Sequence, residues 1–117
     1  DIVCVCCSLN EETFNMITKK HLILLRKNAT LLNTARGEII VEKDLVNTIK
    51  KRKDLNITLD VLAREAENKQ LNSPLIKLHK KREILITPHI SGATIESQYK
   101  AAASSLNLLR KNKKYLS

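Results

Sequence analysis

Four short apolar runs alternate with helix-like segments along this chain, and no other feature of the sequence restricts its fold as strongly. We expect strands at residues 2–7, 30–33, 56–61 and 83–87. Repeating strand–helix units predict a parallel sheet with helices packed against it. The fold class that we expect is therefore α/β, with a doubly wound parallel sheet and flanking helices.

Helix signals fill the segments between the expected strands. Asn10 precedes two carboxylates in what looks like a first helical turn, and Thr18 is placed to cap a second helix that runs to Leu25. Further helices are expected at residues 41–50, 74–78 and 93–111. The last of these has an apolar stripe with helical spacing, formed by Ile95, Tyr99, Ala102, Leu106 and Leu109.

The beginning of the chain leads from Asp1 directly into an apolar run, which we interpret as a cut end. The cysteines Cys4, Cys6 and Cys7 are crowded into this one expected strand, with Cys4 and Cys6 on the same face. A zinc-type site would need a second group of ligands, so we expect no metal. We interpret the three side chains as buried, reduced thiols of a cytoplasmic protein.

Basic residues outnumber acidic ones and give the chain a formal net charge of +9. They form clusters at residues 50–53, 80–82 and 110–114, where helices are expected to end and cations favour the helix dipole. Aromatic residues are only 3% of the chain, so stacking surfaces for nucleic acid are nearly absent. No apolar run approaches the roughly 20 residues of a membrane span. We therefore expect solvated basic surfaces, with neither nucleic acid nor membrane as a partner.

Three polar residues stand at the ends of expected strands, where parallel sheets bind their ligands. Arg36 is able to hold a carboxylate through two hydrogen bonds, and His89 is able to transfer a proton near neutral pH. Asp60 lies between apolar strand residues and needs a partner, which is either a ligand or the backbone. Each residue alone is also compatible with a structural role. Their convergence on one edge of the sheet favours a catalytic site.

Several ordered segments resemble the D-isomer-specific 2-hydroxyacid dehydrogenases. They are Asn-Thr-Ala-Arg-Gly at 33–37, Leu-Asp-Val at 59–61, Asn-Ser-Pro-Leu at 72–75 and Ile-Thr-Pro-His-Ile-Ser-Gly-Ala-Thr at 86–94. The Cys-Ser-Leu that begins at Cys7 is most similar to the glyoxylate/hydroxypyruvate reductase branch. The resemblance implies a partial Rossmann-like fold, in which residues 1–117 form the C-terminal portion of a dinucleotide-binding domain. The half with the Gly-rich loop and the substrate domain would be absent.

The resemblance also implies a function. The full protein would be an oxidoreductase that transfers hydride between NAD or NADP and a small 2-oxo or 2-hydroxy acid, such as glyoxylate or hydroxypyruvate. The branch favours NADPH, and the full-length protein would be a homodimer. The isolated 117 residues would be inactive, because the pyrophosphate-binding loop is missing. The alternative is a non-enzymatic module of the same fold that senses dinucleotide or binds a partner.

The same resemblance assigns roles to individual residues. Arg36 would bind the substrate carboxylate and carbonyl, His89 would be the general acid, and Glu65 would pair with His89 and tune its pKa. Asp60 would contact the nicotinamide carboxamide. The expected cofactor-binding residues are Cys7, Ser8, Thr34, Ala35, Arg36, Asp60, Ser91 and Gly92.

Overall fold

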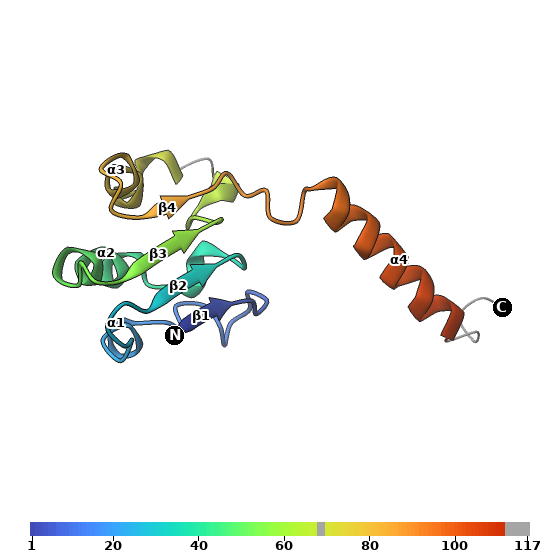
Figure 1. Ribbon diagram of the computed structural model, residues 1–117, viewed down its shortest axis with the longest axis horizontal. Coiled ribbons are helices and arrows are strands. Elements are labelled where there is room, and N and C mark those ends of the chain that lie inside the picture. The colour runs from blue at the N-terminus through green and yellow to red at the C-terminus, as the bar shows by residue number, and fades with distance from the viewer. Residues whose placement is uncertain (68–69, 112–117) are drawn as a thin grey trace.

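A computed structural model describes residues 1–67 and 70–111 of the chain. Its centre is a sheet of four parallel strands in the order β1-β2-β3-β4 (Figure 1). These strands are β1 (Ile2–Val5), β2 (Thr30–Asn33), β3 (Asn56–Leu59) and β4 (Leu85–Ile86). The expected parallel α/β class is confirmed, and only β2 has the bounds that the sequence predicts. The other three strands are shorter.

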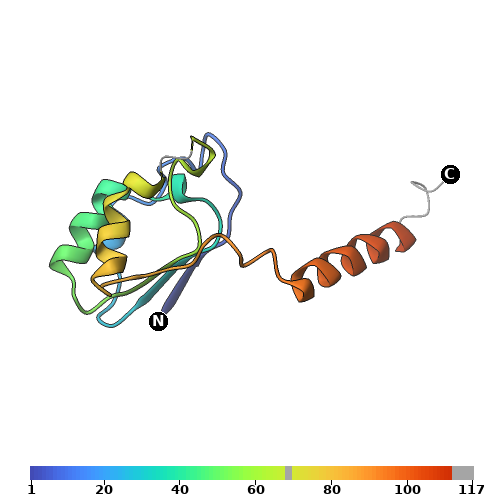
Figure 2. The same ribbon diagram turned by 90° about the horizontal axis from the view of Figure 1, so that it is seen from above.

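Helices connect successive strands and cover one face of the sheet. They are α1 (Lys19–Leu22), α2 (Glu42–Lys51) and α3 (Pro74–Lys80), and α4 (Ile95–Lys111) follows the last strand. Single turns of 3₁₀ helix lie at Gly37–Ile39, Glu65–Glu67 and Gln70–Asn72. Because the strand order advances in one direction, α1, α2 and α3 lie on the same side of this part of the sheet (Figure 2).

The core forms between the sheet and these three helices. Leu31 of β2 and Ile57 of β3 are paired in register and buried beneath Leu45 of α2 and Leu75 of α3. The next residues of the same row, at the ends of β2 and β3, are Asn33 and Leu59. Asn33 is only 1% exposed, so a polar side chain ends an otherwise apolar row.

The expectation of buried thiols is wrong, because β1 is an edge strand. Val5 is its one buried residue, whereas Ile2 is 75% exposed. The unpaired cysteines Cys4 and Cys6 are exposed, with their Sγ atoms 3.2 Å apart, and Cys7 is half-buried. Within the described part of the chain, no strand pairs with the outer side of β1.

The helix expected to begin at Asn10 is also absent from the described residues. The Asn10 side chain does accept hydrogen bonds from the backbone N–H groups of Glu12 and Thr13, as a helix cap would. The chain then turns, because Asn15 adopts a left-handed backbone with φ 54°. By contrast, α1 begins directly after Thr18 as expected, although it ends at Leu22.

The last helix, α4, extends away from the sheet (Figures 1 and 2). None of its residues is buried, and Ile95 and Tyr99 of the expected apolar stripe are 70% and 74% exposed. Among the described helices, none is long and apolar enough to cross a membrane.

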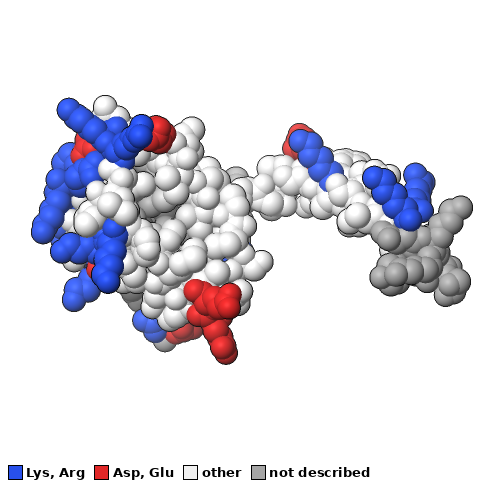
Figure 3. All heavy atoms as spheres, turned by 90° about the horizontal axis from the view of Figure 1, so that it is seen from below, with Lys and Arg blue, Asp and Glu red and all other residues white. Residues whose placement is uncertain are grey.

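The basic clusters at 50–53 and 80–82 span the C-terminal ends of α2 and α3, close to where the next strands begin. Figure 3 shows lysines and arginines gathered at that end of the body. Within these clusters, Arg52 pairs with Asp54 and Lys53 pairs with Glu83. Residues 112–114 of the third cluster lie outside the described residues. The charge is therefore concentrated away from the carboxyl ends of the strands.

Candidate active site

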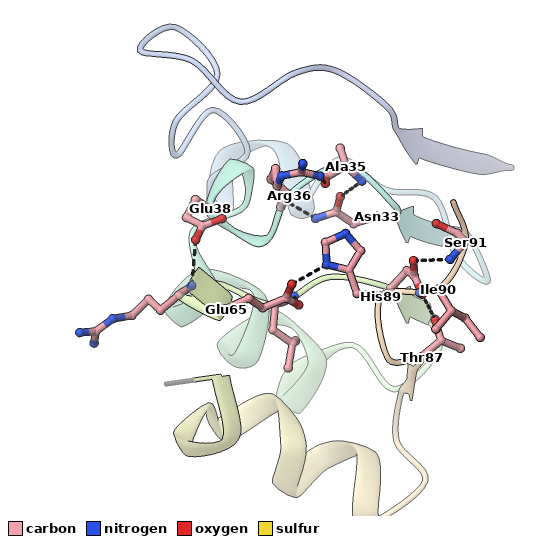
Figure 4. A network of polar contacts seen from close by, with 12 residues as sticks. Asn33, Ala35, Arg36, Glu38, Glu65, Thr87, His89, Ile90 and Ser91 are labelled. Carbon is pink, nitrogen blue, oxygen red and sulfur yellow. Dashed lines mark hydrogen bonds and ion pairs between the residues drawn. The ribbon is translucent and has the colours of Figure 1, made fainter. Parts of the chain in front are cut away.

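Arg36, Glu65 and His89 lie in the loops that follow β2, β3 and β4. Because these strands are parallel neighbours, their carboxyl ends meet along one side of the sheet, which we call the carboxyl edge. Figure 4 shows the His89 ring pointing toward Glu65, with the Arg36 segment on its other side. The sheet therefore brings together three side chains that are far apart in the sequence.

A fixed carboxylate holds the His89 ring. Glu65 Oε2 lies 2.7 Å from His89 Nδ1, and Glu65 Oε1 accepts a hydrogen bond of 2.6 Å from the backbone N–H of Leu62. With Nδ1 facing the carboxylate, Nε2 is the nitrogen that remains for a ligand. This arrangement suits a group that gives a proton to a bound molecule or takes one from it.

The Arg36 guanidinium is free to bind an anion. The side chain is exposed, and its Nη1 donates to the backbone oxygen of Ala35 at 2.6 Å. In the described part of the chain it makes no ion pair with a carboxylate. A planar guanidinium at this place is able to hold a carboxylate of a small ligand with two parallel hydrogen bonds.

Close packing explains the glycine at position 37. A left-handed backbone does not, because φ of Gly37 is not positive. A Cβ atom built at this position would lie 2.1 Å from the backbone N of Ala63 and 2.1 Å from the carbonyl carbon of Leu62. These backbone atoms belong to the segment that leads to Glu65. Gly37 therefore allows the turn after Arg36 to pack directly against the loop that holds His89.

Asp60 is a buried carboxylate, 3% exposed, at the end of β3. Its Oδ1 accepts from the Thr87 hydroxyl at 2.5 Å and from the Ile90 backbone N–H at 3.1 Å, and its Oδ2 accepts from the Ser91 N–H at 2.9 Å. Burial raises the pKa of Asp60, but the hydrogen bonds from Ser91, Thr87 and Ile90 outweigh it and bring the pKa to about 2.

This low pKa predicts a specific loss of stability in acid. The carboxylate is stabilised in the folded state, so its contribution is complete above pH ~4 and disappears as the pH falls toward ~2. A shift of this size corresponds to about 2 kcal/mol. In urea unfolding at a series of pH values, the stability gap between the wild type and Asp60→Asn should narrow over that range. Glu11→Gln, at an exposed carboxylate, is the control. A gap that stays constant with pH contradicts the prediction.

A hollow of about 440 Å³ lies at the carboxyl ends of β1 and β2. It is lined by Cys6, Cys7, Ser8, Leu9, Thr34, Ala35 and Arg36. Four of the expected cofactor-binding positions, in addition to Arg36, thus surround one concave surface. Ser91 and Gly92 are exposed beyond His89, on the far side of the same edge. Asp60 differs from the other candidates because its carboxylate is buried and already accepts three hydrogen bonds from the protein.

These residues fit part of a nicotinamide dinucleotide. The hollow and the exposed Arg36 guanidinium suit a polar ligand that extends along the carboxyl edge. The chain has only two glycines, Gly37 and Gly92, and so lacks a Gly-rich pyrophosphate loop of its own. Among the described residues, no group of three or more His, Cys, Asp or Glu side chains could hold a metal ion.

Two residues with a role at this site were not singled out from the sequence. The Asn33 side chain accepts a hydrogen bond from the backbone N–H of Ala35 and donates one to the backbone oxygen of Arg36. The Thr87 hydroxyl donates to the Asp60 carboxylate. Asn33 carried a usable signal, because it is a polar residue in a strand row that must be buried. Thr87 carried none, since a threonine before proline is ordinary at the end of a strand.

The chain matches known proteins over most of its length. The family described as "D-isomer specific 2-hydroxyacid dehydrogenase, NAD binding domain" matches residues 1–91. The glyoxylate/hydroxypyruvate reductase B of Yersinia pestis bv. Antiqua (strain Nepal516) is 31% identical over 109 residues. That match covers 93% of this chain and 32% of the relative, so the chain spans about a third of the length of the curated relatives it matches.

Solved structures agree with this match. A D-isomer specific 2-hydroxyacid dehydrogenase from Lactobacillus delbrueckii ssp. bulgaricus, in an NAD-complexed form, is 30% identical with a TM-score of 0.71. The match covers 80% of this chain and 32% of the Lactobacillus chain. A D-isomer specific 2-hydroxyacid dehydrogenase from Xanthobacter autotrophicus Py2, in complex with NADPH and MES, is 29% identical with a TM-score of 0.66. The match covers 82% of this chain and 29% of the Xanthobacter chain.

Proposed function

Because this chain belongs to the D-isomer specific 2-hydroxyacid dehydrogenase family, as part of its NAD-binding domain, we propose that the full-length protein reduces a small 2-oxo acid to the 2-hydroxy acid. The observation that carries this proposal is the set of three side chains at the carboxyl edge. Arg36 offers a free guanidinium, and His89 is held through Nδ1 by Glu65 with its Nε2 available. An anion-binding group beside a proton donor suits a 2-oxo acid, which has a carboxylate next to a carbonyl.

The roles of the three side chains follow from their chemistry. The Arg36 guanidinium binds the substrate carboxylate and thereby orients the carbonyl. His89 Nε2 donates a proton to the carbonyl oxygen, and solvent later restores that proton. Glu65 keeps the imidazole oriented and stabilises the cationic ring from which the proton leaves.

The cofactor supplies the hydride that the carbonyl carbon receives. Members of this family bind NAD, and solved relatives contain NAD or NADPH. We propose that Cys7, Ser8, Thr34 and Ala35 border the bound dinucleotide, with Ser91 and Gly92 on the other side of the nicotinamide. The hollow at the ends of β1 and β2 supports this placement. The branch resemblance favours NADPH as the preferred form.

The substrate, assembly and location are proposed on narrower grounds. The name of the Yersinia relative favours glyoxylate or hydroxypyruvate as the substrate of the full-length protein. A homodimer in the full-length form follows from the family resemblance, and sedimentation of that protein tests it. The free cysteines Cys4, Cys6 and Cys7, on β1 and directly after it, support a reducing compartment such as the cytoplasm.

Steady-state assays of the full-length protein test the proposal. We expect oxidation of NADPH or NADH that depends on glyoxylate or hydroxypyruvate, with kcat in the ordinary enzymatic range of about 1–1000 s⁻¹. Acetaldehyde, which has the carbonyl but no carboxylate, is the matched control substrate and should be turned over poorly. A folded protein that binds NADPH and reduces no 2-oxo acid is instead a non-enzymatic dinucleotide-sensing or partner-binding module.

A further inference from the structure

Two buried polar side chains stand at the ends of neighbouring strands, Asn33 on β2 and Asp60 directly after β3. They are 1% and 3% exposed, and polar groups buried to this extent need hydrogen-bond partners to replace water. Their partners are not each other's side chains. Each is satisfied by the turn that carries one of the candidate catalytic residues. We call Asn33 and Asp60 the anchoring pair.

Asp60 binds the turn around His89 from both sides. One hydrogen bond comes from Thr87, two residues before the histidine, and two come from the backbone of Ile90 and Ser91 that follow it. His89 itself has φ 54°, in the left-handed region, which is strained for residues other than glycine. The bonds from Ile90 and Ser91 to one fixed carboxylate stabilise this conformation and so set the direction of the imidazole.

Asn33 binds the turn around Arg36 in the same manner. Its Oδ1 accepts from the backbone N–H of Ala35 at 3.0 Å, and its Nδ2 donates to the backbone oxygen of Arg36 at 2.9 Å. The backbone oxygen of Asn33 also accepts from the Asp60 N–H at 2.9 Å. The anchoring pair is thus joined through the backbone of the sheet. The Asn33 side chain faces the turn around Arg36 (Figure 4), and the Asp60 side chain is hydrogen-bonded to the turn around His89.

We propose that the anchoring pair are positioning residues of this active site, with Asp60 acting through His89 and Asn33 acting through Arg36. This inference rests on the proposed function and deepens it. It also gives Asp60 a role other than the expected contact to the nicotinamide carboxamide. Two carboxylate oxygens offer about four acceptor sites, and three of these are already used within the His89 turn.

Double-mutant cycles in the full-length protein test which residue each anchor acts through. Asp60→Asn replaces an acceptor with a donor opposite the Ser91 N–H, and should lower kcat at least tenfold while KM for the reduced nicotinamide stays within twofold. In a His89→Gln background, Asp60→Asn should lower kcat less than twofold. In an Arg36→Ala background, Asp60→Asn should still lower kcat at least tenfold. Asn33→Ser should show the reverse pattern, with its effect lost in Arg36→Ala and kept in His89→Gln.

If each anchor substitution lowered kcat by the same factor in every background, the anchoring pair would only stabilise the fold. A large rise in KM for the nicotinamide with kcat preserved would mean that Asp60 contacts the cofactor. Either result overturns the proposal. Circular dichroism at the assay temperature establishes that each variant is folded. If Asp60→Asn does not fold, Thr87→Val takes its place, because it removes only the hydroxyl donor to Asp60. It should show the same dependence on the background variant, with a smaller decrease in kcat.

A spectroscopic readout separates this inference from the proposed function. In protein labelled with ¹⁵N-histidine, the His89 Nδ1 signal should report the hydrogen bond to Glu65 in the wild type and lose it in Asp60→Asn and Thr87→Val. Asn33→Ser should leave that signal unchanged. This result is expected whether or not the protein reduces 2-oxo acids. An unaltered Nδ1 signal in both Asp60→Asn and Thr87→Val rejects the role of Asp60.

Discussion

Replacing His89 with glutamine should lower kcat of the full-length protein by about 1000-fold, within the range that positioned general acids contribute. Glutamine keeps a polar side chain of similar reach, but it has no ionisable proton to give to a carbonyl oxygen. Because His89 is exposed and its ring contacts Glu65 from outside the core, the protein should fold normally. KM for the 2-oxo acid should change little, since the substitution leaves the proposed contact between Arg36 and the substrate carboxylate intact.

The matched control for this variant is His21→Gln. His21 is also exposed, but it lies on α1 and not in the loops of the carboxyl edge. Its replacement should leave kcat and KM within twofold of the wild type. If His89→Gln retains more than a tenth of the wild-type kcat, then His89 is not the proton donor and the assignment of the site is wrong.

Replacing Gly37 with alanine should destabilise the fold by about 3 kcal/mol or more, at the upper end of the cost of overpacking. The added methyl group would overlap backbone atoms of Leu62 and Ala63, which cannot rotate away as a flexible side chain could. The turn after Arg36 and the loop before Glu65 must therefore separate. Urea unfolding followed by circular dichroism measures the loss, and the weakened contact should also disorder the Glu65–His89 pair.

Gly92→Ala is the matched control, because a Cβ atom at Gly92 meets nothing within 4 Å. Its φ is not positive either, so alanine adopts the same backbone without strain. The free energy of unfolding should change by less than about 0.5 kcal/mol, as for other surface substitutions. Equal effects of the two substitutions would show that the close approach at Gly37 is not what makes glycine necessary there.

The parts of the fold that followed from the sequence are those that local patterns determine. The apolar run at 30–33 became β2 with the expected bounds, and the 3.6-residue stripe at 41–50 became α2 with a shift of one residue. The Asn10 segment failed, because its cap-like hydrogen bonds also stabilise a simple turn and a left-handed Asn15 ends that turn early. A capping signature does not determine how many turns follow it.

The sequence named candidate residues for the site, but it gave no information about the contacts between them. Strand-end positions and the family resemblance identified Arg36, Glu65 and His89, and the structure places them along one edge. Position alone left the role of Asp60 open between a ligand and the backbone, and the resemblance implied a contact to the nicotinamide carboxamide. The hydrogen bonds join Asp60 to the backbone around His89. Neither those bonds nor the packing at Gly37 is visible in the sequence, because each joins segments more than twenty residues apart.

Transfer of deuterium from the cofactor to the product is the decisive test of hydride transfer to a 2-oxo acid. The full-length protein is supplied with hydroxypyruvate and NADPH, or NADH, that carries deuterium at both positions of C4 of the nicotinamide, and the 2-hydroxy acid is analysed by NMR. We expect one deuterium at C2 of the product and the D configuration, with the hydroxyl proton drawn from solvent. A product with no deuterium at C2, or no product from a folded protein with bound cofactor, would contradict it.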